Sequence, residues 1–148
     1  MGEQLPQEGH RVVVGVDGSD GSKLALDEAV RQAVLTGAAL EAVTAWAWPG
    51  STGWTLPLPD DYDPEADATA MLEALLAPVR VAHPELAIVT VVAEGSPAAL
   101  LVKASGGADL LVVGSRGHGG FSGMLLGSVS EHCTRSAGCP VMVVRGRP

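Results

Sequence analysis

Short apolar runs alternate along the chain with segments whose apolar residues recur every three or four positions. A short run bounded by turn residues is typical of a buried strand, whereas the three-to-four spacing is typical of a helix with one buried face. The runs that predict strands are Val12 to Val16, Leu40 to Trp46, Ala87 to Val92, Leu110 to Val113 and Val141 to Val144. Because these runs are continuously apolar rather than alternating, they favour a parallel sheet covered on both faces.

Helical spacing predicts a helix between each pair of successive runs. The apolar positions are Leu26, Ala29, Val30, Ala33 and Val34 on the first helix and Leu72, Leu75, Leu76 and Val79 on the second. Gly37 ends the first helix, and Pro78 marks the end of the second or a kink in it. Ser96-Pro97 predicts the N-cap and first turn of the third helix, which Gly106-Gly107 closes. The fourth helix begins at Ser128.

This alternation predicts a doubly wound α/β fold with one five-stranded parallel sheet and a single domain, for which we take the strand order to be 3-2-1-4-5. We assign residues 11–148 to the domain and residues 1–10 to a flexible tail. The stretch from Pro49 to Pro64 carries prolines and acids without periodicity, so we expect a long surface loop that serves as a lid or a partner surface. Trp46, Trp48 and Trp54 surround it, and they either stack on an adenine, build a partner surface or pin the loop to the domain.

Composition narrows the classes of partner. Apolar residues make up 47% of the 148 residues and aromatic residues only 3%, so Val, Ala and Leu must fill the core. A net charge of -8 argues against nucleic acid, because no basic stripe is present to neutralise phosphates. The apolar runs are too short to span a membrane, and the N-terminus lacks a basic-then-apolar signal pattern. We therefore expect a cytoplasmic protein without a membrane partner.

The two cysteines, Cys133 and Cys139, do not form the framework of a disulfide-rich secreted protein. Together with His132 they suggest a metal site, but their spacing is not that of paired zinc knuckles and they fall on different predicted elements. We interpret both as buried small hydrophobic residues that remain thiols.

Candidate chemistry gathers where the predicted fold favours a ligand. In an open parallel sheet, ligands bind beyond the carboxyl ends of the strands, at the point where the strand order reverses. For the order 3-2-1-4-5 this point lies between the first and fourth strands, so the Asp-Gly-Ser loop at 17–19 and the Gly-Ser-Arg-Gly loop at 114–117 would face each other. The helix that starts after Gly127 adds unpaired N–H groups and the positive end of a dipole. The crevice is therefore predicted to hold phosphate.

These residues resemble a known family. The spacing Gly114-x2-Gly117-x9-Gly127-Ser128 resembles the nucleotide-binding signature of the universal stress proteins. The VDGS motif after the first strand, the EGSP turn at 94–97, the GSRGHGG loop and the closing GCPVMVVR extend the resemblance over nearly the whole chain. The resemblance implies a Rossmann-like fold, a homodimer, and membership of the ATP-binding subgroup that the glycine signature marks.

The same resemblance implies a set of ligand contacts. ATP, with Mg²⁺, would meet Asp17, Gly18, Ser19, Ala45, Gly114, Ser115, Arg116, Gly117, Gly127, Ser128, Val129 and Ser130. Asp17 would approach the ribose or, indirectly, the metal bound to the phosphates. Backbone around Ala45 would meet the adenine edge, although Thr44 stands where the family often has a histidine. Ser130 would add its hydroxyl to the phosphate contacts.

Structural alternatives exist for several of these residues. Ser128 with Glu131 has the S-x-x-E pattern of a capping box, which needs no ligand. Asp17 suits a helix cap or an Asx turn, and Arg116 suits a surface ion pair. His118 resembles a candidate base, but an exposed loop histidine is usually solvated, and we assign it no catalytic role.

The chain lacks the G-x-x-x-x-G-K-[ST] loop, paired carboxylates, a nucleophile elbow and a catalytic triad. We therefore expect a nucleotide-responsive regulatory protein without catalytic residues, acting through ligand-dependent contacts with an unknown protein partner. Two alternatives remain open, a ligand-free dimeric interaction module and a slow Mg-dependent ATPase. The apolar final strand, Val141 to Val144, would lie at a sheet edge and pair with its copy across a two-fold axis.

Overall fold

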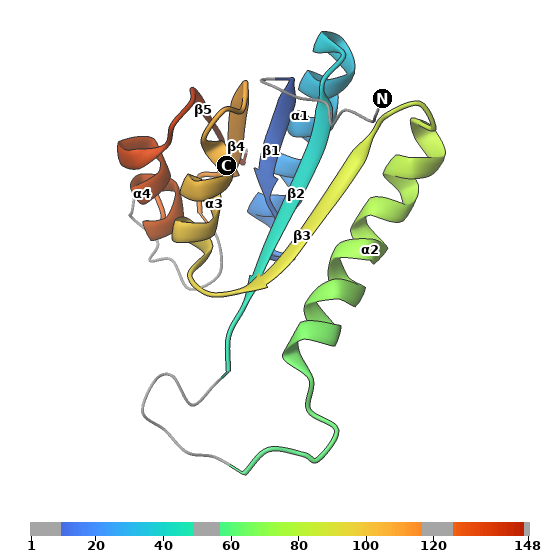
Figure 1. Ribbon diagram of the computed structural model, residues 1–148, viewed down its shortest axis with the longest axis vertical. Coiled ribbons are helices and arrows are strands. Elements are labelled where there is room, and N and C mark those ends of the chain that lie inside the picture. Colours follow the sequence, from blue (N-terminus) through green and yellow to red (C-terminus); the bar gives the residue numbers. More distant parts are fainter. Residues whose placement is uncertain (1–9, 49–56, 117–125, 147–148) are drawn as a thin grey trace, which may run out of the picture.

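A five-stranded parallel sheet with helices on both faces organises the chain (Figure 1). The computed structural model describes residues 10–48, 57–116 and 126–146. Its elements are β1 (Arg11–Gly15), α1 (Asp20–Thr36), β2 (Ala39–Trp46), α2 (Pro64–Ala82), β3 (Ile88–Glu94), α3 (Pro97–Ser105), β4 (Leu110–Gly114), α4 (Ser128–Ser136) and β5 (Val141–Val144). The strand order is β3-β2-β1-β4-β5, which confirms the predicted topology. No helix in these ranges is long and apolar enough to cross a membrane.

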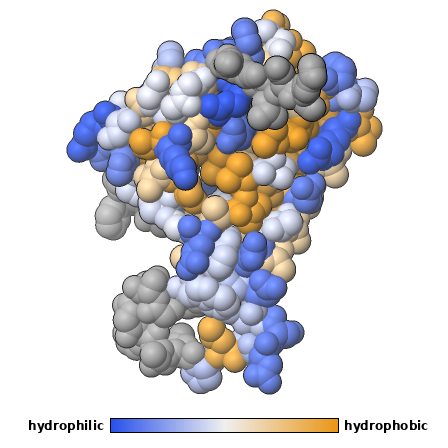
Figure 2. All heavy atoms as spheres, in the orientation of Figure 1, coloured by the Kyte–Doolittle hydropathy of each residue, from blue (hydrophilic) through white to orange (hydrophobic). Residues whose placement is uncertain are grey.

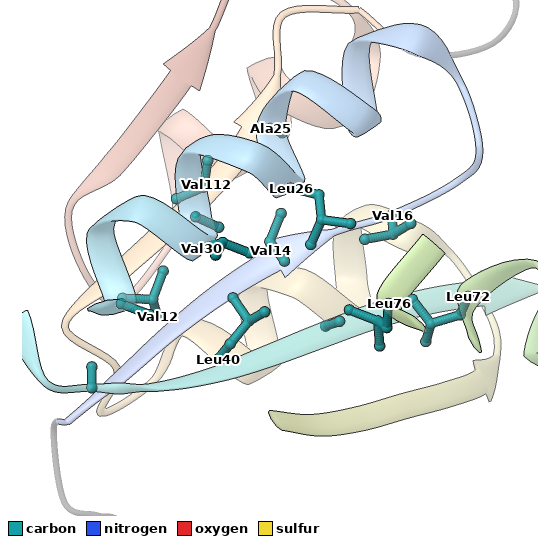
Figure 3. Close-up of a cluster of buried hydrophobic side chains, with 14 residues drawn as sticks. Val12, Val14, Val16, Ala25, Leu26, Val30, Leu40, Leu72, Leu76 and Val112 are labelled. Carbon is teal, nitrogen blue, oxygen red and sulfur yellow. The ribbon is translucent and has the colours of Figure 1, made fainter. Parts of the chain in front are cut away.

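Alternate residues of the central strands build two separate cores. Val14 and Leu40 point toward α1 and α2, where Leu72 and Leu76 close the cluster drawn in Figure 3. Val13, on the other face of β1, packs with residues of α3 and α4. Each fully buried Val or Leu contributes about 1.5–3 kcal/mol, so a core nearly free of aromatic side chains still stabilises the sheet from both sides.

The two faces of the sheet are covered unequally. The helices α1 and α2 have 17 and 19 residues, whereas α3 and α4 have nine each. The short helices leave part of the sheet open, and Figure 2 shows apolar side chains gathered over β2 and β3 beside α3. Val89 on β3 is accordingly 43% exposed. On the other face of β3, Ile88 and Val92 are partly buried against the cluster of α1 and α2.

Side chains and glycines fix the helix ends. The Ser19 hydroxyl accepts from the N–H of Ser22 at 3.2 Å, and Gly37 ends α1 in the left-handed conformation at φ 73°. Ser96 caps α3 and Pro97 follows as its first residue, as predicted. Pro78 does not end α2, which continues to Ala82. Packing of the apolar stripe on both sides of Pro78 holds the helix together despite the missing N–H.

Several predicted boundaries were wrong by one or two residues. β1 ends at Gly15 rather than Val16, and β3 continues to Glu94 because it pairs with β2 as far as Trp46, the last residue of β2. Of the predicted loop, residues 57–63 are described and 49–56 lie outside the described residues, as do residues 1–9 of the predicted tail. Trp48 and Tyr62, on either side of the gap, have ring centroids 5.9 Å apart, and Trp46 meets Trp48 edge-on at 5.7 Å. Trp54 lies outside the described residues.

The cysteines are free thiols. Cys133 is fully buried, as predicted, and burial raises the pKa of its thiol, so it behaves as a small hydrophobic residue. The prediction that Cys139 is buried was wrong, because this residue lies in the turn between α4 and β5 and is partly exposed. Partial burial still raises the pKa of its thiol, despite the nearby Arg11. Within the described ranges, no group of three His, Cys, Asp or Glu side chains is placed to hold a metal.

Candidate functional site

The carboxyl ends of β1 and β4 lie side by side at the point where the sheet reverses its winding. From β1 the chain turns into α1 and on to β2, whereas from β4 it goes through α4 to β5 on the other side. Such a switch point opens a crevice between the two strand ends. The predicted ligand loops at 17–19 and 114–117 leave from these two ends, so the topology brings them to one edge.

The loop after β1 is held by its own side chains. One carboxylate oxygen of Asp17 accepts from the N–H of Ser19 at 2.9 Å and from its hydroxyl at 2.5 Å. The N–H of Asp17 donates to the Ser22 hydroxyl at 3.2 Å. Gly18 between them has φ 84°, a conformation that favours glycine. The Asx-turn alternative for Asp17 is therefore present, and it places an exposed carboxylate at the crevice.

The loop after β4 begins with a close backbone contact. A Cβ atom added at Gly114 would lie 2.7 Å from the carbonyl oxygen of Gly21 and 2.8 Å from its carbonyl carbon. Gly114 therefore serves the approach of β4 to α1, a structural requirement independent of any ligand. It stands at the start of the motif because only a glycine lets the two backbones pass at this distance.

Ser115 joins the loop to both neighbouring elements. Its N–H donates to the carbonyl oxygen of Val144 at 2.8 Å, and its own carbonyl oxygen accepts from the N–H of Gly127 at 2.6 Å. The Ser130 hydroxyl is within hydrogen-bond distance of the carbonyl oxygens of Ser115 and Gly127, at 3.0 Å from each. Ser130 is only 1% exposed. The sequence predicted that the Ser130 hydroxyl contacts phosphate. The hydroxyl is instead buried and bonded to the loop after β4, so it does not reach the crevice.

The N-terminus of α4 carries no side-chain cap. Gly127 is the N-cap residue, with φ -76° and ψ 170°, and Ser128 is already the first helical residue. The predicted capping box of Ser128 and Glu131 is therefore wrong, and Glu131 pairs instead with Arg135 at 3.0 Å. By contrast, α1, α2 and α3 each begin with a side chain that accepts from the first turn. A glycine cap leaves the first-turn N–H groups of α4 to be satisfied from outside the helix.

Ala45 offers backbone groups to the same edge. Residues of β2 bond alternately to their two neighbours, and Trp46 bonds to the β3 side through the N–H of Gly95. Val43 faces β1, where it accepts from the N–H of Val16 at 2.9 Å, and the pairing with β1 ends there. The N–H and C=O of Ala45 thus point beyond the end of β1.

The other residues predicted for the loop after β4 lie at or beyond residue 116, where the described range ends. Arg116 is exposed at the end of the segment that follows β4. Gly117, the middle glycine of the motif, and His118 lie outside the described residues.

Sequence reasoning missed two buried polar side chains that shape the crevice. Thr44 is 2% exposed, and its hydroxyl donates to the carbonyl oxygen of Val16 at 2.9 Å. Ser22 is buried as well, and its hydroxyl donates to the carbonyl oxygen of Ser19 at 3.1 Å. Both fix the exit of β1. Their signal was a polar residue at a position where the apolar periodicity demands burial.

Comparison with known proteins gives the family. A family model of the universal stress protein family matches residues 9–145. The chain belongs to this family. It is 41% identical over 140 residues to a universal stress protein of Mycobacterium tuberculosis, a match that covers 90% of this chain and 44% of that protein. It is 39% identical over 137 residues to one of Mycolicibacterium smegmatis, covering 92% and 46%. The chain thus spans about half the length of these universal stress proteins.

Solved universal stress proteins share the fold. One in complex with cAMP is 31% identical to this chain, with a TM-score of 0.69, and the match covers 95% of this chain and all of that one. Another, from Archaeoglobus fulgidus in complex with dAMP, has a TM-score of 0.64 over 93% of this chain and 99% of its own. At 20% identity the second likeness bears on the fold alone.

Proposed function

We propose that this universal stress protein binds an adenine nucleotide, ATP with Mg²⁺, between the ends of β1 and β4. The observation that carries the proposal is the N-terminus of α4, which among the described residues has a glycine cap without a side-chain acceptor. Through Ser115 it is joined to the exit of β4, and β4 pairs with β1, the strand that leads into the Asp17 loop. First-turn N–H groups and the helix dipole together favour phosphate at such a helix end. The complex of a 31% identical universal stress protein with cAMP supports an adenine nucleotide as the ligand class.

In this proposal each part of the ligand has its own contacts. The first-turn N–H groups of Ser128, Val129 and Ser130 hold the phosphates. Asp17 faces the ribose or the Mg²⁺ bound to the phosphates, and the backbone of Ala45 meets the adenine. Gly18, Ser19, Gly114, Ser115, Arg116, Gly117 and Gly127 line the rest of the proposed site. The N–H groups of Ser19, Ser115 and Gly127 are already donated within the protein, so these three residues do not supply donors to the phosphates. Mg²⁺ would supply charge neutralisation to the phosphates, since carboxylate and phosphate oxygens are its preferred ligands.

The proposed activity is regulation rather than catalysis. Nucleotide bound between the two loops orders them and changes a surface that a protein partner, or a second copy of the chain, contacts. Such a switch is limited by the difference in affinity of the nucleotide for the two loop arrangements. Phosphoryl transfer would need a positioned nucleophile and strong charge stabilisation beyond one carboxylate.

The test places a carboxylate where the phosphate is proposed to bind. Gly127 has an extended backbone that any residue adopts, so Gly127→Asp adds a side-chain cap to α4. We expect the variant to be as stable as the wild type or more stable by a few tenths of a kcal/mol, the usual difference between aspartate and glycine at an N-cap. Its affinity for ATP should nevertheless fall at least about tenfold, because the new carboxylate takes the N–H groups and repels phosphate.

The measurement is calorimetric titration of the nucleotide-stripped protein with ATP and Mg²⁺, with cAMP in parallel. Gly127→Ala is the matched control, since it adds a side chain without an acceptor or a charge. Equal ATP affinity in the wild type and Gly127→Asp would remove α4 from the site. A wild type that binds neither nucleotide would favour the ligand-free dimeric module, and steady release of phosphate that Asp17→Ala abolishes would favour the slow ATPase.

A further inference from the structure

Gly21 is the second residue of α1, a position where glycine is unfavourable. Apart from proline, glycine is the poorest helix former, because it loses the most backbone freedom when it becomes helical. Its φ is not in the left-handed region, so no backbone conformation requires it. Neither helix propensity nor backbone conformation explains Gly21, which leaves steric exclusion of a side chain by a neighbouring atom as the reason.

The steric reason is the backbone of the loop after β4. A Cβ atom added at Gly21 would overlap the carbonyl oxygen of Arg116, and one added at Gly114 would reach the carbonyl oxygen of Gly21 at 2.7 Å. The first turn of α1 and the exit of β4 thus touch backbone to backbone through two glycines. In both cases the obstructing atoms belong to backbone, which cannot swing aside as the end of a flexible side chain can.

This contact joins the two halves of the proposed nucleotide site. On one side, the first turn of α1 is bonded to Asp17 through Ser19 and Ser22. On the other side, Ser115 is bonded to Gly127 at the start of α4. The separation of Asp17 from the N-terminus of α4 is therefore set by how closely α1 approaches the loop after β4.

We propose that Gly21 is a positioning residue of the nucleotide site, a role that rests on the proposed function. It touches no ligand itself. It lets α1 sit against the Arg116 backbone, and so holds the Asp17 carboxylate at the distance from the α4 N-terminus that one nucleotide spans. A side chain at this position pushes the two loops apart, although it changes the identity of none of the proposed contact residues.

The other end of the same helix supplies a matched control. Gly37 has φ 73°, and a Cβ atom there would meet nothing within 4 Å. Gly37→Ala therefore strains the backbone and lowers stability without crowding a neighbour, and it lies away from the crevice at the carboxyl end of α1. Gly21→Ala, by comparison, improves helix propensity and introduces a clash at the crevice.

The experiment compares wild type, Gly21→Ala and Gly37→Ala by calorimetric titration with ATP and Mg²⁺ and by thermal melting without nucleotide. We expect Gly21→Ala to bind about ten- to a hundredfold more weakly, since misplacing a precisely positioned group by about 1 Å can cost an enzyme about a hundredfold in rate and the site has the same need for fixed geometry. Its melting temperature should fall no further than that of Gly37→Ala, which should keep the wild-type affinity. Amide NMR shifts of Ser115 and Gly127 should move in Gly21→Ala alone.

Three results would overturn the proposal. The first is wild-type affinity in Gly21→Ala, and the second is a loss of affinity in both variants that follows their loss of stability. The third is a Gly21→Ala chain that does not fold, which would make the contact a requirement of the whole fold. A wild type that binds no nucleotide would instead refute the proposed function, and the positioning role with it.

Discussion

At the scale of single residues, Arg11 shows how one side chain joins three elements. Its guanidinium donates to a carboxylate oxygen of Glu41 on β2 at 2.7 Å, to the carbonyl oxygen of Ala104 at 3.1 Å and to that of Gly106 at 2.9 Å. The side chains of Arg11 and Glu41 are only 23% and 15% exposed. A cation at the C-terminal carbonyls of α3 is also favoured by the helix dipole. The bridge fixes α3 to the amino ends of β1 and β2.

Replacing this arginine should destabilise the fold. We expect Arg11→Met to lower the free energy of unfolding by about 2–3 kcal/mol, because Glu41 and two carbonyl oxygens lose a charged partner in a half-buried place. Urea denaturation followed by circular dichroism measures the change. Arg135→Met is the control, since Arg135 is 71% exposed and its pair with Glu131 is worth about 0.5 kcal/mol or less. Equal effects of the two substitutions would contradict the bridge.

At the scale of elements, a buried hydroxyl ties α3 to the turn before β5. Ser105 is the last residue of α3 and is fully buried. Its hydroxyl donates to the carbonyl oxygen of Val102 at 2.6 Å and accepts from the N–H of Gly138 at 2.8 Å. The turn that follows α4 therefore depends on a residue more than thirty positions earlier in the chain.

Ser105→Ala removes the acceptor of the Gly138 N–H in a part-buried place. The expected loss is about 1 kcal/mol in the free energy of unfolding, the usual net contribution of one hydrogen bond. Hydrogen exchange by NMR should show faster exchange at Gly138 while amides in the middle of β1 keep their protection. A loss of stability with unchanged exchange at Gly138 would mean that cavity formation, rather than the hydrogen bond, causes it.

The sequence predicted the existence of the helices and strands correctly, but it misplaced some of their ends. Apolar periodicity predicted all five strands, because burial of both sheet faces leaves a strong pattern, and the strand order assumed for a doubly wound fold is the one observed. Periodicity misplaced the end of β3, since strand ends depend on pairing with β2 rather than on hydropathy. The S-x-x-E spacing suggested a capping box at Ser128 as a structural alternative, but Gly127 is the cap. The contact of Gly21 with Arg116 had no sequence signal, because close approach of two backbones appears only in three dimensions.

At the scale of the whole molecule, β5 is an edge strand whose backbone N–H and C=O groups point alternately toward β4 and away from the sheet. Leu111 donates to the carbonyl oxygen of Pro140, and Ser115 donates to that of Val144. Even-numbered residues of β5 therefore bond to β4, whereas the N–H and C=O of Val141 and Val143 point away from the sheet. These outward groups are the ones that a second copy would pair in the proposed homodimer.

Proline scanning of this edge tests the dimer. Val143→Pro removes an outward N–H, so we expect a folded monomer where the wild type sediments as a dimer. Val144→Pro removes an N–H on the β4 side and should lower the free energy of unfolding by about 1–3 kcal/mol more than Val143→Pro. Analytical ultracentrifugation and urea denaturation measure the two effects. A Val143→Pro dimer as tight as the wild type would exclude the β5 edge as the interface.

The aromatic contacts beyond β2 have a spectroscopic consequence. Trp46 follows Ala45 directly, stacks edge-on against Trp48, and has a buried indole N–H without a hydrogen-bond partner within the described ranges. Trp48 in turn contacts Tyr62 at the far side of the loop. The emission of this group depends on the polarity and order of its surroundings, one peptide unit from the proposed adenine position. The protein therefore carries its own fluorescent reporter, and ligand arrival can be timed without an attached dye.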